Sequence, residues 1–276
     1  MTQVPVNVQI LGIFRYCHAP SVNTFLPVDS SREWPPEAAT PTFSLPRAGH
    51  ASGIASPQPV GVFDSAAYMV RCADPHHHGH AIRLLVERRY AWRGLHAAGG
   101  GHHATRPDAI TLVASSGAHV FGTVTLCLDG VDGLLADALY SEELALHRQG
   151  AARLCEITRL AVDTHHNTKQ VLGALFHLIY IHSRLIHGAT AVIIEVHPRH
   201  AGFYKRMLGF TEIGGEKACP RVNNAPAVLL HLDMRLVDEQ IAMLGGTGSS
   251  RARSLYAYFL SRDEQDELLA SLIAGH

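Results

Sequence analysis

Hydrophobic residues alternate with polar ones, or recur at helical spacing, along most of the chain after residue 60. A period of two is typical of a strand with one buried face, and recurrence every three or four residues is typical of an amphipathic helix. The strands predicted in this way are Val62–Cys72, Ala109–Ser115, His119–Leu128, Leu154–Val162, Thr190–Val196 and Ala227–Met234. The predicted helices are His77–Leu95, a short one at Glu142–His147, Val171–His187 and Pro198–Leu208, the last of which should end at Gly209.

The order β-α-β-β-β-α-β-α-β predicts an α/β fold, in which helices flank a mixed sheet. Thr190–Val196 is almost wholly apolar, so we expect a central strand that is buried on both faces. It follows Leu154–Val162 through a helix, which is the pattern of a right-handed βαβ unit. Ligands of such sheets bind beyond the carboxyl ends of the parallel strands. The sequence therefore predicts a site near Ala161–Lys169 and Val196–His200.

The two ends of the chain differ from its middle. Residues 1–60 contain nine of the fourteen prolines and are predicted to form an extended or partly disordered arm. Alternation in Val4–Arg15 leaves open an edge strand or a flexible segment. Residues 61–236 are expected to form one domain. Residues 237–276 should hold a glycine-serine linker and a helix at Arg253–Ile273, whose apolar stripe docks on the domain or on a partner subunit, which leaves a homodimer open.

Composition excludes several classes of protein. The net charge of −1 gives no basic field for nucleic acid. Five cysteines without CxxC spacing do not form a disulfide framework and fit a reducing compartment. No apolar run reaches the roughly 18 residues of a membrane span, and no signal-peptide pattern opens the chain. We therefore expect a cytoplasmic protein.

Histidine is unusually frequent, with 20 copies, several of them adjacent. Metal sites need ligands on a rigid scaffold, such as the HExxH pattern, which the sequence lacks. The clusters lie in stretches flanked by glycine and proline. We therefore interpret them as loop histidines and expect no metal site.

Three stretches carry a resemblance to a known superfamily. They read EITRLAVD from Glu156, EVHPRHAGFYKRMLGF from Glu195 and CPRVNNAPAVLLHLDM from Cys219. With the predicted strand order, they resemble the GNAT superfamily of acyltransferases. Within it, they are most similar to the long-chain N-acyl amino acid synthases, which are related to acyl-homoserine lactone synthases. The resemblance covers roughly Phe63 to Met234 and implies a GNAT-like fold.

The resemblance also implies an activity. Such enzymes transfer a long fatty acyl group from acyl carrier protein to the α-amine of an amino acid, often tyrosine. Two other enzymes stay open as alternatives, an acyl-CoA-dependent N-acyltransferase and an acyl-homoserine lactone synthase. A GNAT-like binding module without catalysis is an alternative of another class.

The predicted loop after Leu154–Val162 departs from the GNAT pattern. Enzymes that use coenzyme A usually carry Gln/Arg-x-x-Gly-x-Gly/Ala there, with backbone amides that hold the pyrophosphate at a helix N-terminus. Here residues 163–170 contain no glycine, and the first one is Gly173. This favours a donor that presents only acyl-phosphopantetheine, with Lys169 meeting its phosphate. No permanently bound cofactor is expected.

Two carboxylates are candidates for the base that the ammonium group of an amino acid requires. Glu156 lies in an apolar strand, where it could be the catalytic base or a partner of Arg159 or Arg153. Glu195, near the end of the next strand, is the second candidate, with a structural role as its alternative. Arg159 suits the carboxylate of the acceptor. Because Glu156 and Arg159 are three residues apart, a bulge is needed if both are to serve one site.

The remaining candidates concern the leaving thiolate, the substrate, the oxyanion and the carrier protein. The resemblance assigns Tyr204 the protonation of the leaving thiolate, although packing on its own helix also explains a tyrosine there. His197 and His200 either orient a substrate or are solvated. Backbone amides of Leu160, Ala161 and Val162 could bind the oxyanion. Basic residues for docking an acidic carrier protein are Arg88, Arg89, Arg93, Lys205 and Arg206.

Overall fold

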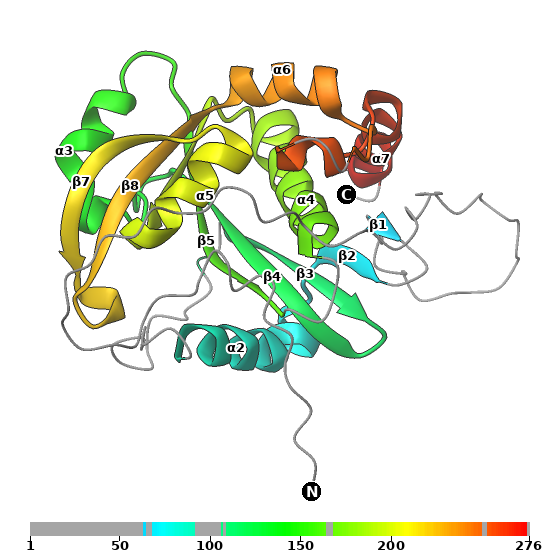
Figure 1. The fold of residues 1–276 in the computed structure, drawn as a ribbon, viewed down its shortest axis with the longest axis horizontal. Helices are drawn as coiled ribbons and strands as arrows, with labels where there is room; N and C mark the ends of the chain where they lie inside the picture. The colour runs from blue at the N-terminus through cyan, green and yellow to red at the C-terminus, as the bar shows by residue number, and fades with distance from the viewer. Residues whose placement is uncertain are drawn as a thin grey trace, which may run out of the picture.

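The computed structural model describes residues 63–64, 68–91, 106, 109–163, 168–249 and 253–274. They form an eight-stranded sheet in the order β1-β2-β3-β4-β5-β6-β8-β7 (Figure 1). Only β5 and β6 are parallel, and all other neighbouring strands are antiparallel. The predicted mixed α/β sheet flanked by helices is therefore confirmed. The arm over residues 1–60 and the strand at Val4–Arg15 lie outside the described residues.

The elements have the following bounds. The strands are β1 (Phe63–Asp64), β2 (Met69–Cys72), β3 (Ala109–Ser116), β4 (His119–Leu128), β5 (Leu154–Val162), β6 (Ala191–Val196), β7 (Thr211–Cys219) and β8 (Ala225–Asp233). The α-helices are α2 (Pro75–Ala91), α3 (Asp137–His147), α4 (Thr168–Tyr180), α5 (Pro198–Leu208), α6 (Met234–Leu244) and α7 (Arg262–Ala274). Three further helical segments are the π-helix η1 (Ile181–Ile186) and the 3-10 turns η2 (Pro220–Val222) and η3 (Leu255–Tyr258).

One strand prediction was wrong, and one strand was missed. Val62–Cys72 is not one strand, because β1 and β2 pair with each other as antiparallel strands. The strand β7 was not predicted at all. It lies at the edge of the sheet, has several exposed side chains, and carries register shifts beside Gly214. Such an irregular, partly solvated edge strand gives little hydrophobic alternation to detect.

The helix prediction with the clearest end signals is confirmed. Helix α5 spans Pro198–Leu208 as predicted, and Gly209 ends it with φ 83°, in the left-handed region that glycine adopts freely. Helix α4 begins at Thr168, three residues earlier than predicted, and it continues as η1. The wider turn of η1 is closed by the His187 N–H, which donates to the His182 carbonyl at 3.1 Å.

The C-terminal helix predicted at Arg253–Ile273 was wrong as a single element. The 3-10 turn η3 ends at Tyr258, Phe259 is extended, and α7 begins only at Arg262. Most of the predicted apolar stripe is nevertheless buried within this one chain, namely Leu255, Tyr258, Phe259, Leu268 and Leu272. Its docking partner is therefore the domain itself.

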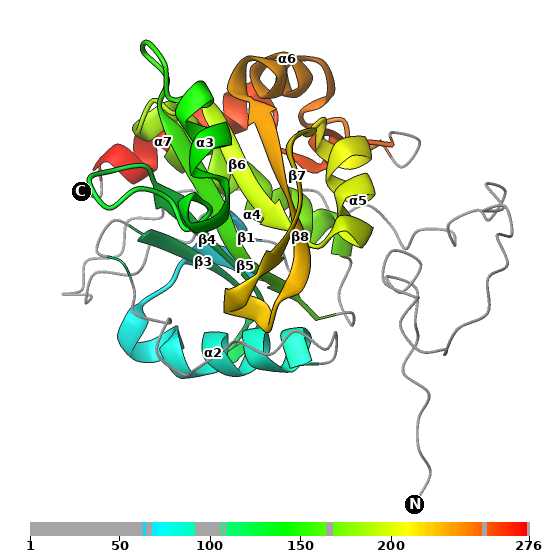
Figure 2. The ribbon, with the colours of Figure 1, turned by 90° about the vertical axis from the view of Figure 1, so that its left-hand side faces the viewer.

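Helices cover both faces of the sheet, and side-chain alternation decides which face each residue meets. On β3, Val113 packs with α2, whereas its neighbours Leu112 and Ala114 belong to the core that includes α4. On β6, Ile193 packs with α3, and Ile194 faces the α4 core. Figure 1 shows α2 and α4 on opposite sides of β3 and β4, and Figure 2 shows β7 and β8 running side by side near α5.

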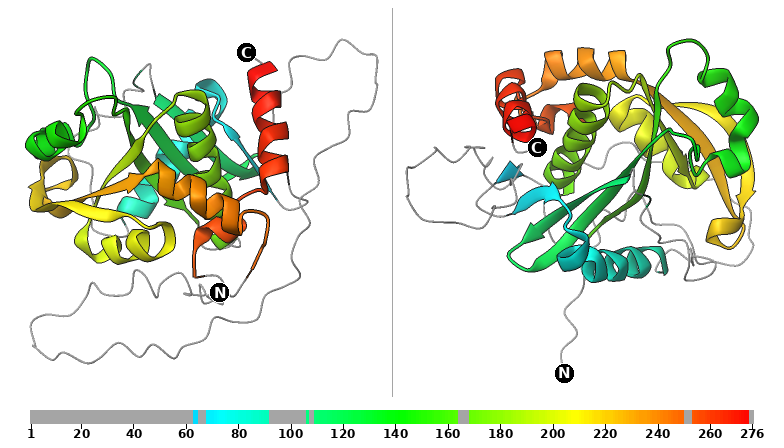
Figure 3. Two further views of the ribbon diagram at one scale, coloured as in Figure 1. Left: turned by 90° about the horizontal axis from the view of Figure 1, so that it is seen from above. Right: turned by 180° about the vertical axis from the view of Figure 1, so that it is seen from behind.

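We call residues 245–274 the C-terminal segment, and it packs beside α4 (Figure 3). His177 of α4 is fully buried and joins the two. Its Nδ1 accepts from the Leu260 N–H at 2.8 Å, its Nε2 lies 3.1 Å from Gln265 Oε1, and its ring stacks on Phe259. A side chain on Gly173 would meet Tyr258 Cβ at 2.6 Å, so this glycine permits the close approach.

Among the described residues, the structure contains no helix with the length and apolar character needed to cross a membrane.

The buried imidazole of His177 makes a testable contribution to stability. Burial lowers its pKa to about 4, so the unfolded chain binds the proton more tightly than the folded one. This contribution is complete above pH 6.5 and is lost as the pH falls towards 4. Between pH 8 and pH 5, wild type should lose about 2 kcal/mol more of its unfolding free energy than His177→Asn.

Urea titrations at the two pH values measure this difference. The exposed His80 provides the control, since His80→Asn should keep the wild-type pH dependence. Equal pH dependence in wild type and His177→Asn would contradict the assignment.

Candidate active site

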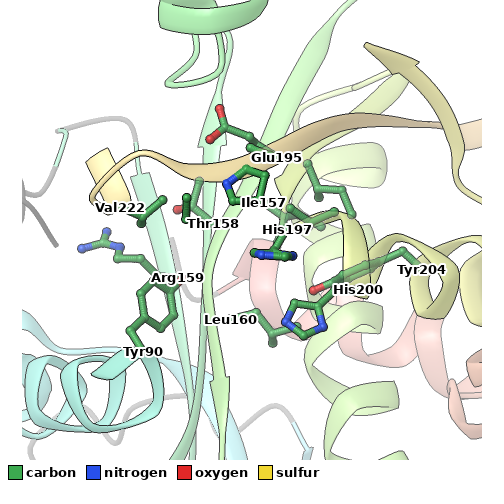
Figure 4. Close-up of a pocket in the computed structure, with 15 residues that line it drawn as sticks. Tyr90, Ile157, Thr158, Arg159, Leu160, Glu195, His197, His200, Tyr204 and Val222 are labelled. Carbon is green, nitrogen blue, oxygen red and sulfur yellow. The ribbon is translucent and has the colours of Figure 1, made fainter. Parts of the chain in front are cut away.

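A pocket opens where the two parallel strands part. The ladder between β5 and β6 contains three residue pairs and ends at Glu156 and Ile193. Beyond that point β5 stays paired with β4, and β6 with β8. The pocket has a volume of about 140 Å³, and residues 157–160 of β5 and 194–197 at the end of β6 line it (Figure 4). This is the predicted carboxyl end of the parallel strands.

A bulge on β5 turns Arg159 towards this pocket. Thr158 pairs with Thr125 and Ala161 with Thr123, so two residues of β5 face a single residue of β4. Arg159 has φ 51°, a left-handed conformation that costs a residue with a side chain about 1–3 kcal/mol. Its guanidinium makes no hydrogen bond or ion pair with any residue that the structure describes. A strained cation that lines a pocket and pairs with no described residue is suited to an anionic group of a ligand.

Helix α5 contributes His200 and Tyr204 to the pocket, and its N-cap contributes His197. His197 caps the helix, and its Nδ1 accepts from the Arg199 N–H at 3.3 Å. Burial lowers its pKa and favours the neutral ring, whose single proton must then be on Nε2. In Figure 4, Arg159 and Tyr90 lie on one side and His200 and Tyr204 on the other, with His197 and Leu160 between them.

Glu195 also lines the pocket, and it pairs with Arg221, which was not among the predicted site residues. Arg221 of η2 donates from Nη2 to Glu195 Oε2 at 2.5 Å and from Nη1 to the Leu135 carbonyl at 2.9 Å. The pair joins the connection between β7 and β8 to β6. Since 26 residues separate the two partners, no local spacing could have revealed it.

Glu156 lies behind the pocket wall and does not line it. Its carboxylate is 1% exposed and accepts from the N–H groups of Leu135, at 2.6 Å, and Ala136, at 3.3 Å. Burial raises the pKa of Glu156 to about 7, against the opposing effect of these two N–H groups. Neither Arg159 nor Arg153 is its partner among the described residues. The two backbone N–H groups stand where the sequence left open an ion pair.

The structure gathers six of the predicted residues and leaves the others outside the pocket. Those that line it are Arg159, Leu160, Glu195, His197, His200 and Tyr204. Ala161 and Val162 are paired with β4 and buried. Lys169 is at the start of α4, where its ammonium lies 5.9 Å from the centre of the Tyr258 ring.

Several pocket residues were not predicted as site residues. They are Tyr90, Ile157, Thr158, Ile194, Val196, Val222, Ala225, Pro226 and Ala227. Most are apolar, and nothing in their identity distinguishes them from core residues. Within the described ranges, the structure contains no group of three or more His, Cys, Asp or Glu side chains arranged to hold a metal ion.

Comparison with known proteins identifies the family. The sequence profile of the family described as "N-acyl amino acid synthase FeeM" matches residues 81–233, more than half of the chain. The solved structure of FeeM, an N-acyl amino acid synthase from uncultured soil microbes, is 28% identical, with a TM-score of 0.55 over 61% of this chain and 91% of that one. No curated protein matches the sequence significantly.

Two acyl-homoserine lactone synthases are more distant. LasI is 13% identical, with a TM-score of 0.45 over 60% of this chain and 90% of its own. The CoA-dependent enzyme BjaI, solved with SAM and isopentyl-CoA, is 16% identical, with a TM-score of 0.46 over 63% of this chain and 87% of its own. On the profile match and the likeness to FeeM, the chain is an acyltransferase of the GNAT superfamily and belongs to the FeeM family of N-acyl amino acid synthases.

Proposed function

We propose that the chain transfers a long fatty acyl group from acyl carrier protein to the α-amine of a free amino acid. The observation that carries this proposal is Arg159, which lines the same pocket as Glu195 and has no hydrogen-bond or ion-pair partner among the described residues. A free amino acid has one carboxylate and one ammonium group. Arg159 would bind the carboxylate through its planar fork, and Glu195, while paired with Arg221, would accept a hydrogen bond from the ammonium.

The apolar part of the pocket supports an acceptor with a large side chain. Val222, Pro226 and Ala227 line the wall formed by β8 and the turn before it. Tyr90 of α2 lies beside Arg159 (Figure 4). These surfaces favour an aromatic acceptor such as tyrosine, which would bury its ring there.

The reaction forms a C–N bond and breaks the C–S bond of the acyl thioester. As the amine attacks, negative charge develops on the carbonyl oxygen. We assign its stabilisation to the backbone N–H of Leu160, which lies in the bulge, and to the Nε2–H of neutral His197. Tyr204 would then donate its phenolic proton to the departing thiolate. His200 packs near His197 and orients the start of α5.

The amine must also lose a proton, and we propose that the two carboxylates divide this work. Glu195 contacts the ammonium group from within the pocket. Glu156 has a pKa of about 7, which suits a general base at neutral pH. Because Glu156 does not line the pocket, the proton would reach it through one water molecule.

The donor is proposed from the start of α4. Gly173 lies inside this helix and against Tyr258, so it is not available as a phosphate cradle. This supports a carrier protein that presents acyl-phosphopantetheine, with Lys169 near its phosphate, over acyl-CoA. An acyl-homoserine lactone synthase remains the second alternative.

Basic residues near the pocket are proposed to receive the acidic carrier protein, although the structure weakens part of this set. Arg88 donates to Asp163 at 2.5 Å, and Lys205 pairs with Glu212 at 2.8 Å, so both charges are already balanced within the chain. Arg89 is half-buried, Arg206 is exposed on α5, and Arg93 lies outside the described residues.

The role of Arg159 predicts a specific loss of acceptor binding. Arg159→Ala should raise the KM for the amino acid about 10–100-fold, since a hydrogen-bonded charge contributes about 1.5–3 kcal/mol. Wild type should also discriminate against the amide of the same amino acid, which lacks the carboxylate, and the variant should not. Steady-state kinetics with both acceptors measure this.

The exposed Arg153, which precedes β5, serves as a matched control, because it does not line the pocket. Arg153→Ala should behave as wild type. If Arg159→Ala still preferred the acid over the amide as strongly as wild type does, Arg159 would not bind the carboxylate.

The division of work between the carboxylates predicts different kinetic effects. Glu156→Gln should lower kcat about 100-fold and remove the rise of kcat with pH near 7, because the base must be ionised to accept the proton. Glu195→Gln should mainly raise the KM for the amino acid. If Glu156→Gln kept both its turnover and its pH profile, this residue would only support the turn before α3.

A further inference from the structure

A second, apolar cavity lies behind the pocket, on the α4 side of the sheet. Its volume is about 20 Å³, and its lining contains no charged side chain. The two cavities share Ile157 of β5. Tyr204 of the pocket also packs edge-on against Phe210 of the second cavity, with 5.9 Å between ring centres. A thioester held in the pocket therefore has an apolar interior next to it.

Four of the side chains around this cavity come from the chain after residue 233. They are Met234, Val237, Tyr256 and Phe259. The family match ends at residue 233, so this part of the wall is supplied by residues outside it. Tyr256 and Phe259 belong to the C-terminal segment and close the cavity from the side of α4 and α6.

The C-terminal segment is fixed in place by several polar contacts. The Tyr256 hydroxyl donates to the Leu208 carbonyl at 2.7 Å, and the Ser254 hydroxyl donates to the Met207 carbonyl at 3.2 Å. The Gly246 N–H donates to the Phe259 carbonyl at 2.8 Å. With the His177 contacts, these bonds hold both aromatic rings in defined positions. Side chains held in fixed positions can limit how far a bound acyl chain extends into the cavity.

We propose that Tyr256 and Phe259 of the C-terminal segment set the length of the acyl chain that the enzyme accepts. This inference rests on the proposed function, because it takes the apolar cavity as the place that receives the acyl chain. As it stands, the cavity has room for about one water-sized group. A long chain must therefore displace side chains, and each buried methylene gains only about 0.8 kcal/mol for doing so. The bulk and anchoring of the wall thus decide where extension stops.

Two variants should move the preferred length in opposite directions. Phe259→Leu removes volume from the wall and should shift the preferred saturated chain by about two carbons to longer lengths. Val237→Leu adds one methylene from α6 and should shift it to shorter ones. Leu268→Val is the matched control, because Leu268 is buried in α7 of the same segment but does not line the cavity. Circular dichroism and thermal melts check that each variant is folded.

Two readouts are needed, of which one does not depend on turnover. First, the full chain receives an equimolar mixture of C8 to C18 acyl carrier proteins and an amino acid, and mass spectrometry gives the product ratios. Second, thermal shifts are measured with free saturated fatty acids of the same lengths. We expect the C16 to C12 ratio of products to rise at least fivefold in Phe259→Leu, with a parallel change in the fatty acid that stabilises best.

The outcomes separate the two proposals. If wild type makes no N-acyl product, but the fatty-acid profile still shifts in Phe259→Leu, the proposed function fails and the length-setting wall stands. If a folded Phe259→Leu shifts neither profile, or shifts no more than Leu268→Val, the wall does not set the length. If no fatty acid stabilises wild type and no product forms, the cavity receives no chain and the inference is overturned.

Discussion

The site depends on the separation of two parallel strands that are each held by an antiparallel neighbour. β5 and β6 pair over only three residues, yet both remain in the sheet because β4 and β8 supply hydrogen bonds along the rest of their length. Two central strands can therefore part without leaving many buried backbone groups unpaired. The separation exposes backbone and side chains from both strands to one space. Arg159, Glu195, His197 and Tyr204, which act in the proposed mechanism, line this opening.

Charge in the site is arranged so that one cation is available and another is already used. Arg221 is bound to Glu195 and to the Leu135 carbonyl, and it ties the β7–β8 connection to the pocket. Arg159 is held in a left-handed conformation by the bulge and has no partner among the described residues. Strain without a structural reward is typical of residues that act on a ligand. Glu156 is a third case, since its carboxylate supports the turn before α3 and yet has a pKa near neutrality.

The sequence predicted much of the framework because the signals there are local. Strand β5 and helix α5 have the predicted bounds, since apolar alternation and the Pro198 and Gly209 end signals depend only on neighbouring residues. The sequence did not show the bulge at Arg159. It showed only that a bulge is needed if Glu156 and Arg159 are to serve one site. Pairs of residues that are distant in sequence, such as Arg221 with Glu195, could not be predicted, because no local spacing indicates them. The edge strand β7 and the broken helix before α7 were missed because their form is set by tertiary contacts.

The pocket between β5 and β6 is proposed to join an acyl group to an amino acid. The most direct test gives the purified full chain all twenty amino acids and a lauroyl group on acyl carrier protein, and in parallel on coenzyme A, and identifies products by mass spectrometry. On this proposal we expect an N-lauroyl amino acid, formed faster from the carrier protein, and a loss of at least about tenfold in rate for Tyr204→Phe. Absence of any N-acyl product from both donors, or an undiminished rate in Tyr204→Phe, would contradict it.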